Sequence, residues 1–131
     1  MKRLFVLLLA VAVLLGPAVP SVFAIAPLRA QFMETYKDSK IAQAAEEAKC
    51  DVCHYGKKKK DRNDFGVAVS KYFKKTDYDS LKDDKEKLKA AIETALKKAE
   101  AEKSVSGKTF AELIKEGKLP GTPPKEVEES E

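Results

Sequence analysis

The chain has 131 residues, of which 44% are hydrophobic, and its 25 Lys and Arg against 21 Asp and Glu give a formal net charge of +4. This length suits one small domain and leaves no room for a second one. So mild a charge balance argues against a protein that binds nucleic acid.

The first 24 residues are typical of a secretory signal peptide. Lys2 and Arg3 precede an uncharged apolar run, residues 4–15, and cleavage after Ala24 would make Ile25 the mature N-terminus. Cleavage would lower the net charge to +2. The apolar run is shorter than the about 20 residues that span a bilayer, so we expect an exported protein that does not contact the membrane after cleavage. An uncleaved membrane anchor is the alternative.

Helical periodicity dominates the rest of the chain, and no segment alternates long enough to predict a strand. The first predicted helix spans residues 40–54. The second spans residues 64–74, with Asp61 or Asn63 as its cap. The positions of these two helices that we expect to face the core are Ile41, Ala44, Ala45, Ala48, Val52, Phe65, Ala68, Val69, Tyr72 and Phe73.

Two further helices follow, and they complete an all-α fold class with about four helices. The third spans residues 81–103. The fourth is capped by Thr109, forms a capping box with Glu112 and ends at Gly117. Their expected core positions are Leu88, Ala91, Ile92, Ala95, Leu96, Ala99, Phe110, Leu113 and Ile114.

These elements make up one predicted domain, residues 25–118. Residues 119–131 are rich in proline and acidic side chains. We therefore expect them to form a disordered acidic tail.

Both cysteines and the only histidine lie close together as Cys50, Cys53 and His54. A disulfide between them would close too short a loop to stabilise a fold. A zinc site would lack a fourth ligand, and a thioredoxin-type pair would follow a strand that the sequence does not predict. C-x-x-C-H is instead the attachment signature of c-type haem, in which both thiols bond to the porphyrin vinyl groups and the imidazole binds the iron.

The spacing of these residues suits that role on a helix. Cys50 and Cys53 are three residues apart and His54 lies one turn beyond Cys50, so all three can face one porphyrin edge and its iron. The export signal supports the same interpretation, because thioethers form outside the bacterial cytoplasm on an unfolded, reduced chain.

The stretch from the first predicted helix through KCDVCHYG to RNDFG resembles the small monohaem c-type cytochromes that bacteria secrete. The resemblance covers most of the mature chain, with Gly56 and the later GKLPG as weaker similarities. It implies a small cytochrome c-like bundle around one covalently attached haem, in the periplasm or otherwise exported. Cys50 and Cys53 would attach the haem c and His54 would bind its iron. The resemblance implies an electron carrier, not an enzyme, that passes single electrons between redox partner proteins.

The chain departs from many of these cytochromes at the sixth iron ligand, because no methionine follows the motif. Met33 is the only methionine of the mature chain, and core filling is an equally simple role for it. Lysine, tyrosine or an open position are the other possibilities. An open position would instead indicate a gas-ligand sensor or a weak peroxidase.

Four consecutive lysines, residues 57–60, follow the motif. They can form a positive patch near the haem that steers an acidic partner, or a solvated loop. Arg62 can reach a haem propionate or lie in solvent. Tyr55 and Phe65 are expected to pack against the ring or the core.

Overall fold

The structure is a computed structural model that describes residues 25–123. The predicted signal peptide and residues 124–131 lie outside the described residues. The elements in chain order are α2 (Ala26–Tyr36), α3 (Ala42–Ala48), the 3-10 helix η1 (Lys49–Val52), β1 (His54–Tyr55), β2 (Asp61–Arg62), α4 (Asp64–Tyr72), α5 (Lys75–Leu81), α6 (Lys85–Glu100) and α7 (Phe110–Lys115). The described part is therefore mostly helical, as predicted, but it has six α-helices where about four were expected, and one small antiparallel hairpin, β1–β2.

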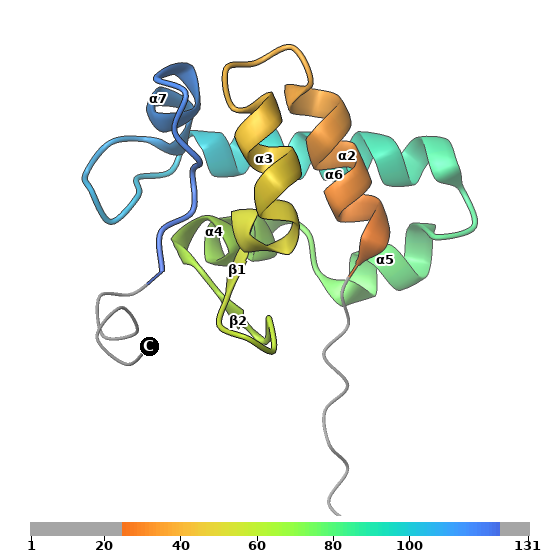
Figure 1. The fold of residues 1–131 in the computed structure, drawn as a ribbon. Helices are drawn as coiled ribbons and strands as arrows, with labels where there is room; N and C mark the ends of the chain where they lie inside the picture. The colour runs from red at the N-terminus through yellow and green to blue at the C-terminus, as the bar shows by residue number, and fades with distance from the viewer. Residues whose placement is uncertain (1–24, 124–131) are drawn as a thin grey trace, which may run out of the picture.

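The long helix α6 organises the domain (Figure 1). It contacts α2, α4, α5 and α7, and in Figure 1 it runs behind α2 and α3 across the width of the molecule. Asp84 caps it by accepting a hydrogen bond from the backbone N–H of Lys87. Its buried face consists of Leu88, Ile92, Ala95, Leu96 and Ala99, all among the positions predicted to face the core.

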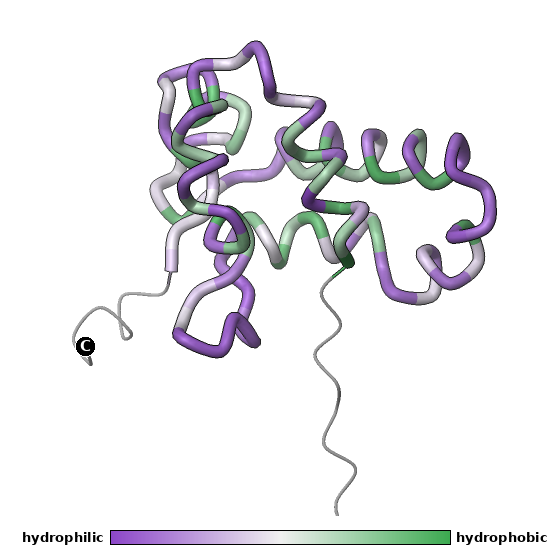
Figure 2. The backbone as a smooth tube through the Cα atoms, turned by 45° about the vertical axis from the view of Figure 1, so that its right-hand side comes forward, coloured by the Kyte–Doolittle hydropathy of each residue, from purple (hydrophilic) through white to green (hydrophobic). Residues whose placement is uncertain are grey.

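A row of aromatic rings fills the space between α2, α4 and α7. The ring of Phe32 lies 4.5 Å from that of Tyr36 and 6.0 Å from that of Phe65, measured between centroids. The ring of Phe65 lies 5.1 Å from that of Phe110. Phe65 and Phe110 are at most 1% exposed, so the centre of the domain is closed by side chains. By contrast, the loop of the β1–β2 hairpin, which lies below the helices in Figure 2, is hydrophilic.

Two helix starts are confirmed. Asn63 caps α4 by accepting a hydrogen bond from the Gly66 backbone N–H, and Thr109 forms the predicted capping box with Glu112 at the start of α7. Gly117 follows α7 with a φ of 82°, a conformation that favours glycine. The third predicted helix is shorter than expected, because α6 begins after its Asp84 cap and α5 forms a separate element before it.

Helix α2 was not predicted, although it supplies part of the core. It begins with Pro27 in its first turn, where a missing N–H costs nothing. Leu28, Phe32 and Tyr36 follow at intervals of four, which places them on one face. Buried Gln31 interrupts the apolar pattern, so the periodicity of the sequence does not predict this helix. None of the helices described is both long enough and apolar enough to cross a bilayer.

The start of the predicted tail differs from the expectation. Residues 119–123 lie against the domain, and Pro120 is less than 2% exposed. The backbone N–H of Thr122 donates to the Asp64 carboxylate at 2.7 Å. These contacts hold the segment in place, so a disordered tail beginning at residue 119 is wrong for residues 119–123.

Candidate cofactor-attachment site

The C-x-x-C-H motif does not lie on one regular helix, which corrects the prediction of a helix over residues 40–54. Helix α3 ends at Ala48, and Lys49 has a φ of 54°, outside the helical region. Cys50 then lies in the 3-10 helix η1, Cys53 follows that helix, and His54 begins β1. The helix ends early because the chain turns here into the β1–β2 hairpin.

The spacing of the two thiols nevertheless has a structural basis. The Cys53 backbone N–H donates to the Cys50 carbonyl at 3.2 Å, so the two residues are one 3-10 turn apart. Residues three apart lie directly above each other in a 3-10 helix. Cys50 is exposed, Cys53 is partly buried, and both are free thiols.

The His54 ring is oriented by its own hairpin. Its Nδ1 atom lies 3.2 Å from the backbone carbonyl oxygen of Asp61, on the opposite strand. In the tautomer that donates this hydrogen bond, Nε2 carries a free lone pair. Imidazoles that bind metals commonly have this second contact, which fixes the ring and its tautomer. The donor set of Cys50, Cys53 and His54 therefore fits a covalently attached haem.

Sequence reasoning assigned Asn63 only to a helix cap, but its side chain also contacts the motif. Nδ2 donates to the carbonyls of Asp51 and Val52, the two residues between the cysteines. The signal that could have revealed this role is that Asn63 is the only asparagine of the chain and directly precedes α4.

Burial determines the charge state of the Cys53 thiol. It raises the pKa of Cys53 to about 12, with a smaller contribution from Cys50, while Arg62 acts in the opposite direction. The thiolate is the reactive form of cysteine, so Cys53 is a weak nucleophile in the folded protein at neutral pH.

Basic side chains surround the motif. Lys57, Lys58 and Lys60 are exposed in the hairpin loop, whereas Lys59 forms an ion pair with Asp51. Arg62 is exposed and lies directly opposite His54 in the strand register. The loop therefore combines one lysine that ties it to the motif with three that face solvent.

The other candidate residues differ in burial. Met33 is partly buried on α2 and packs against the core, Phe65 is fully buried, and Tyr55 is partly buried. Within residues 25–123, no three His, Cys, Asp or Glu side chains form a group that could hold a bare metal ion.

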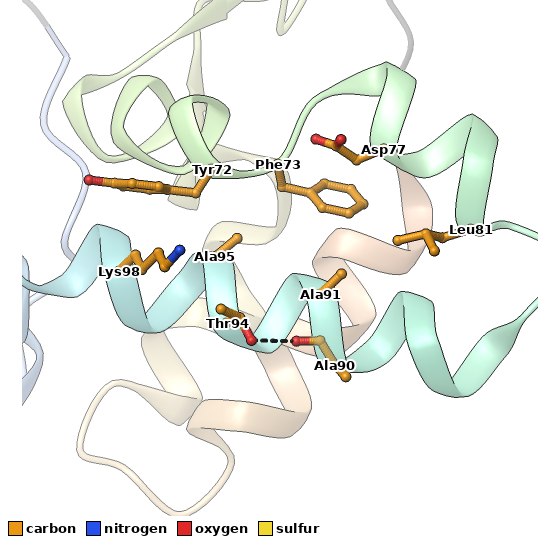
Figure 3. A pocket seen from close by; sticks show the side chains of 9 residues that line it. All are labelled: Tyr72, Phe73, Asp77, Leu81, Ala90, Ala91, Thr94, Ala95 and Lys98. Atoms are coloured by element: carbon orange, nitrogen blue, oxygen red, sulfur yellow. Dashed lines mark hydrogen bonds between the residues drawn. The ribbon is translucent and has the colours of Figure 1, made fainter.

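A surface hollow lies on another part of the domain (Figure 3). It is formed by α4, α5 and α6, and its lining includes Tyr72, Phe73 and Lys98 but none of the motif residues. Figure 3 shows the Tyr72 and Phe73 rings above the α6 surface, where Thr94 donates to the Ala90 carbonyl at 2.8 Å. The hollow has no cluster of chemically reactive side chains.

Comparison with protein-family profiles, with curated proteins and with solved structures finds no match to this chain. The fold is a small, mostly helical domain. The contacts of Cys50, Cys53 and His54 are therefore the basis on which a function can be proposed.

Proposed function

We propose that this protein is an exported c-type cytochrome that carries one covalent haem and passes single electrons between redox partners. It would act as a carrier and not as an enzyme. The observation that carries the proposal is the hydrogen bond between His54 Nδ1 and the Asp61 carbonyl, directly after two free thiols one turn apart.

The attachment chemistry needs no co-reactant beyond the haem. At each cysteine the S–H adds across one vinyl double bond: a carbon–sulfur bond forms, the vinyl π bond breaks, and the proton ends on the neighbouring carbon. No electrons are gained or lost, but both thiols must be free. Cys50 and Cys53 are free in this structure, which supports the proposal.

The residues around the motif have defined tasks in such a carrier. The haem, when bound, supplies an iron that alternates between the ferrous and ferric states. His54 would bind that iron through Nε2, and its contact with Asp61 would keep the ring from rotating. Arg62, opposite His54 in the hairpin, supplies a guanidinium suited to a carboxylate.

The closed aromatic core refines the expected cytochrome c-like architecture. Phe65 and Phe110 fill the space between α2, α4 and α7, so the haem would lie outside this aromatic row. Because Cys50 is exposed, its thiol also favours a haem on the solvent-facing side of the motif, outside the aromatic row. A haem with one edge near solvent suits exchange of single electrons with a partner.

The alternative function is a haem protein with an open sixth position, a gas-ligand sensor or a weak peroxidase. Met33 packs against the core, so it has a structural role that does not require its sulfur to bind iron. This packing supports the alternative. Carbon monoxide distinguishes the two functions, since ferrous iron with an open position binds it readily and firmly six-coordinate iron resists.

The proposal is tested by expressing the full chain in a bacterium that has haem-attachment machinery. A pyridine haemochrome spectrum of the purified protein should show a c-type haem that stays on the polypeptide in a denaturing gel. The Cys50→Ala/Cys53→Ala variant is the matched control and should lack covalent haem. If the wild-type protein has two titratable thiols and no haem absorbance, the proposal is wrong.

A further inference from the structure

We propose that Asn63 is the positioning residue of the attachment loop, residues 50–54, and that a C-terminal clasp, residues 119–122, holds it in place. What the loop carries rests on the proposed function. The contacts that support the inference are those of the polypeptide itself.

Asn63 is 1% exposed, and its side chain makes three hydrogen bonds with backbone groups. Nδ2 donates to the carbonyls of Asp51 at 3.2 Å and Val52 at 3.0 Å. Oδ1 accepts from the backbone N–H of Gly66 at 2.9 Å. A carboxamide can donate two hydrogens on one side and accept on the other, whereas a carboxylate of the same size only accepts. The loop therefore requires asparagine at this position and not merely a helix cap.

The backbone of Asn63 adds a third contact with the loop. Its N–H donates to the Cys53 carbonyl at 2.9 Å, so three successive carbonyls, those of residues 51–53, are bound by one residue. Asn63 also directly follows β2, the strand that pairs with His54. One residue thereby fixes the thiol turn relative to the hairpin that orients the imidazole.

Two close approaches keep these contacts in register. A Cβ atom at Gly66 would overlap the Cys53 carbonyl oxygen, and a Cβ atom at Gly121 would overlap the Asn63 carboxamide and the Val52 carbonyl oxygen. The clasp that contains Gly121 is anchored by buried Pro120 and by the 2.7 Å hydrogen bond between Thr122 and Asp64. The clasp therefore closes over Asn63, and its glycine allows the contact.

Two variants disturb this arrangement by different chemistry. Asn63→Asp keeps an acceptor for the Gly66 N–H but places a carboxylate against two carbonyls. Gly121→Ala keeps asparagine at position 63 but displaces its side chain by steric overlap, without adding charge. Thr109→Ala is the control, since it removes the side-chain cap of α7 and touches neither the loop nor the clasp.

Hydrogen exchange of the purified full-length proteins, followed by mass spectrometry, tests the inference. We expect the amides of residues 50–56 to exchange at least tenfold faster in Asn63→Asp and Gly121→Ala than in wild type. Thr109→Ala should change them no more than it changes those of α6. If the two loop variants behave like Thr109→Ala in residues 50–56, Asn63 does not position the loop.

A second measurement separates positioning from general stabilisation. In the haem-loaded protein, Gly121→Ala should shift the reduction potential while Thr109→Ala leaves it unchanged, because only the former displaces the loop that orients His54. An unchanged potential in Gly121→Ala contradicts a positioning role. If the protein carries no haem, the proposed function fails, whereas hydrogen exchange still decides the inference about Asn63.

Wild-type protein provides a test that needs no variant to fold. Asn63 is the only asparagine of the chain, so its carboxamide signals in an NMR spectrum are assigned by residue type. We expect these protons to exchange at least tenfold more slowly than those of exposed Gln43. Equal rates would overturn the inference.

Discussion

The Nδ1 atom of His54 lies 3.2 Å from the carbonyl oxygen of Asp61, across the two-stranded hairpin that follows the cysteines. This single contact orients the only histidine of the chain and leaves its Nε2 atom available. The C-x-x-C-H motif is recognisable from the sequence alone, whereas this contact across the hairpin was not predicted from it.

The first prediction concerns His54 as the iron ligand. In His54→Ala both thioethers should still form, because Cys50 and Cys53 are unchanged, but the iron should lose its imidazole and change its optical spectrum. Added imidazole should restore the spectrum toward that of wild type. Lys57→Ala, in the adjacent loop, is the control and should leave the spectrum unchanged. An unaltered spectrum in His54→Ala would assign the iron to another ligand.

The second prediction concerns alkaline pH and the buried Tyr36. Its hydroxyl donates to the Glu100 carboxylate, and burial and this contact raise the pKa of Tyr36. The phenol ionises at about pH 10 in the unfolded chain but at higher pH in the folded protein. Its contribution to stability is therefore complete below about pH 10 and is lost as the pH rises further.

Tyr36→Phe tests this linkage by urea unfolding at a series of pH values. Loss of the hydroxyl should cost about 1 kcal/mol at pH 7. Above pH 10 the unfolding free energy of wild type should fall more steeply than that of the variant, by up to about 1.4 kcal/mol per pH unit. Parallel pH profiles would show that Tyr36 titrates alike in both states.

The third prediction concerns the exposed lysines of the hairpin loop. Replacing Lys57, Lys58 and Lys60 with Glu preserves the ion pair of Lys59 with Asp51. At low ionic strength, oxidation of the ferrous protein by ferricyanide should slow by on the order of tenfold, because an anionic partner is no longer attracted. The difference should shrink as salt is added.

The matched control for this experiment replaces Lys82, Lys85 and Lys89 with Glu, near the junction of α5 and α6. These side chains are exposed. The junction of α5 and α6 lies well apart from the β1–β2 hairpin in Figure 1. The same rate in both triple variants would mean that only net charge matters and that the hairpin lysines are simply solvated.

The fourth prediction concerns Met33. Because it is partly buried against the core, Met33→Ala should lower the free energy of unfolding by about 2 kcal/mol, the low end for such truncations. The optical spectrum of the haem protein should not change. If wild type shows the weak red absorption band typical of a thioether ligand and Met33→Ala loses it, Met33 binds the iron.

The sequence predicts the parts of the fold that depend on local signals. The caps at Asn63 and Thr109 are read directly from polar residues at fixed distances, and the core face of α6 from its repeated apolar positions. Helix α2 was missed because buried Gln31 disrupts its apolar stripe and the residues it packs against lie far along the chain. Tertiary contacts, not local propensity, make it part of the core.

The candidate site follows the same division. The identities of Cys50, Cys53 and His54 and their spacing are evident from sequence. Their geometry is not, because the helix is interrupted at Lys49 and the loop is held by Asn63 from the other end of the hairpin. The clasp was missed as well, since a segment rich in proline indicates disorder unless a buried contact such as that of Pro120 holds it.

The mass of the intact protein under denaturing conditions tests the central claim most directly. The full chain, expressed with haem-attachment machinery and treated with a thiol-alkylating reagent, should carry the added mass of one haem and no alkyl group on Cys50 or Cys53. The Cys53→Ala variant should have a lower yield of stable haem protein, with one thioether at most. A wild-type mass without haem and with two alkylated cysteines would contradict the proposal that this chain is a c-type cytochrome.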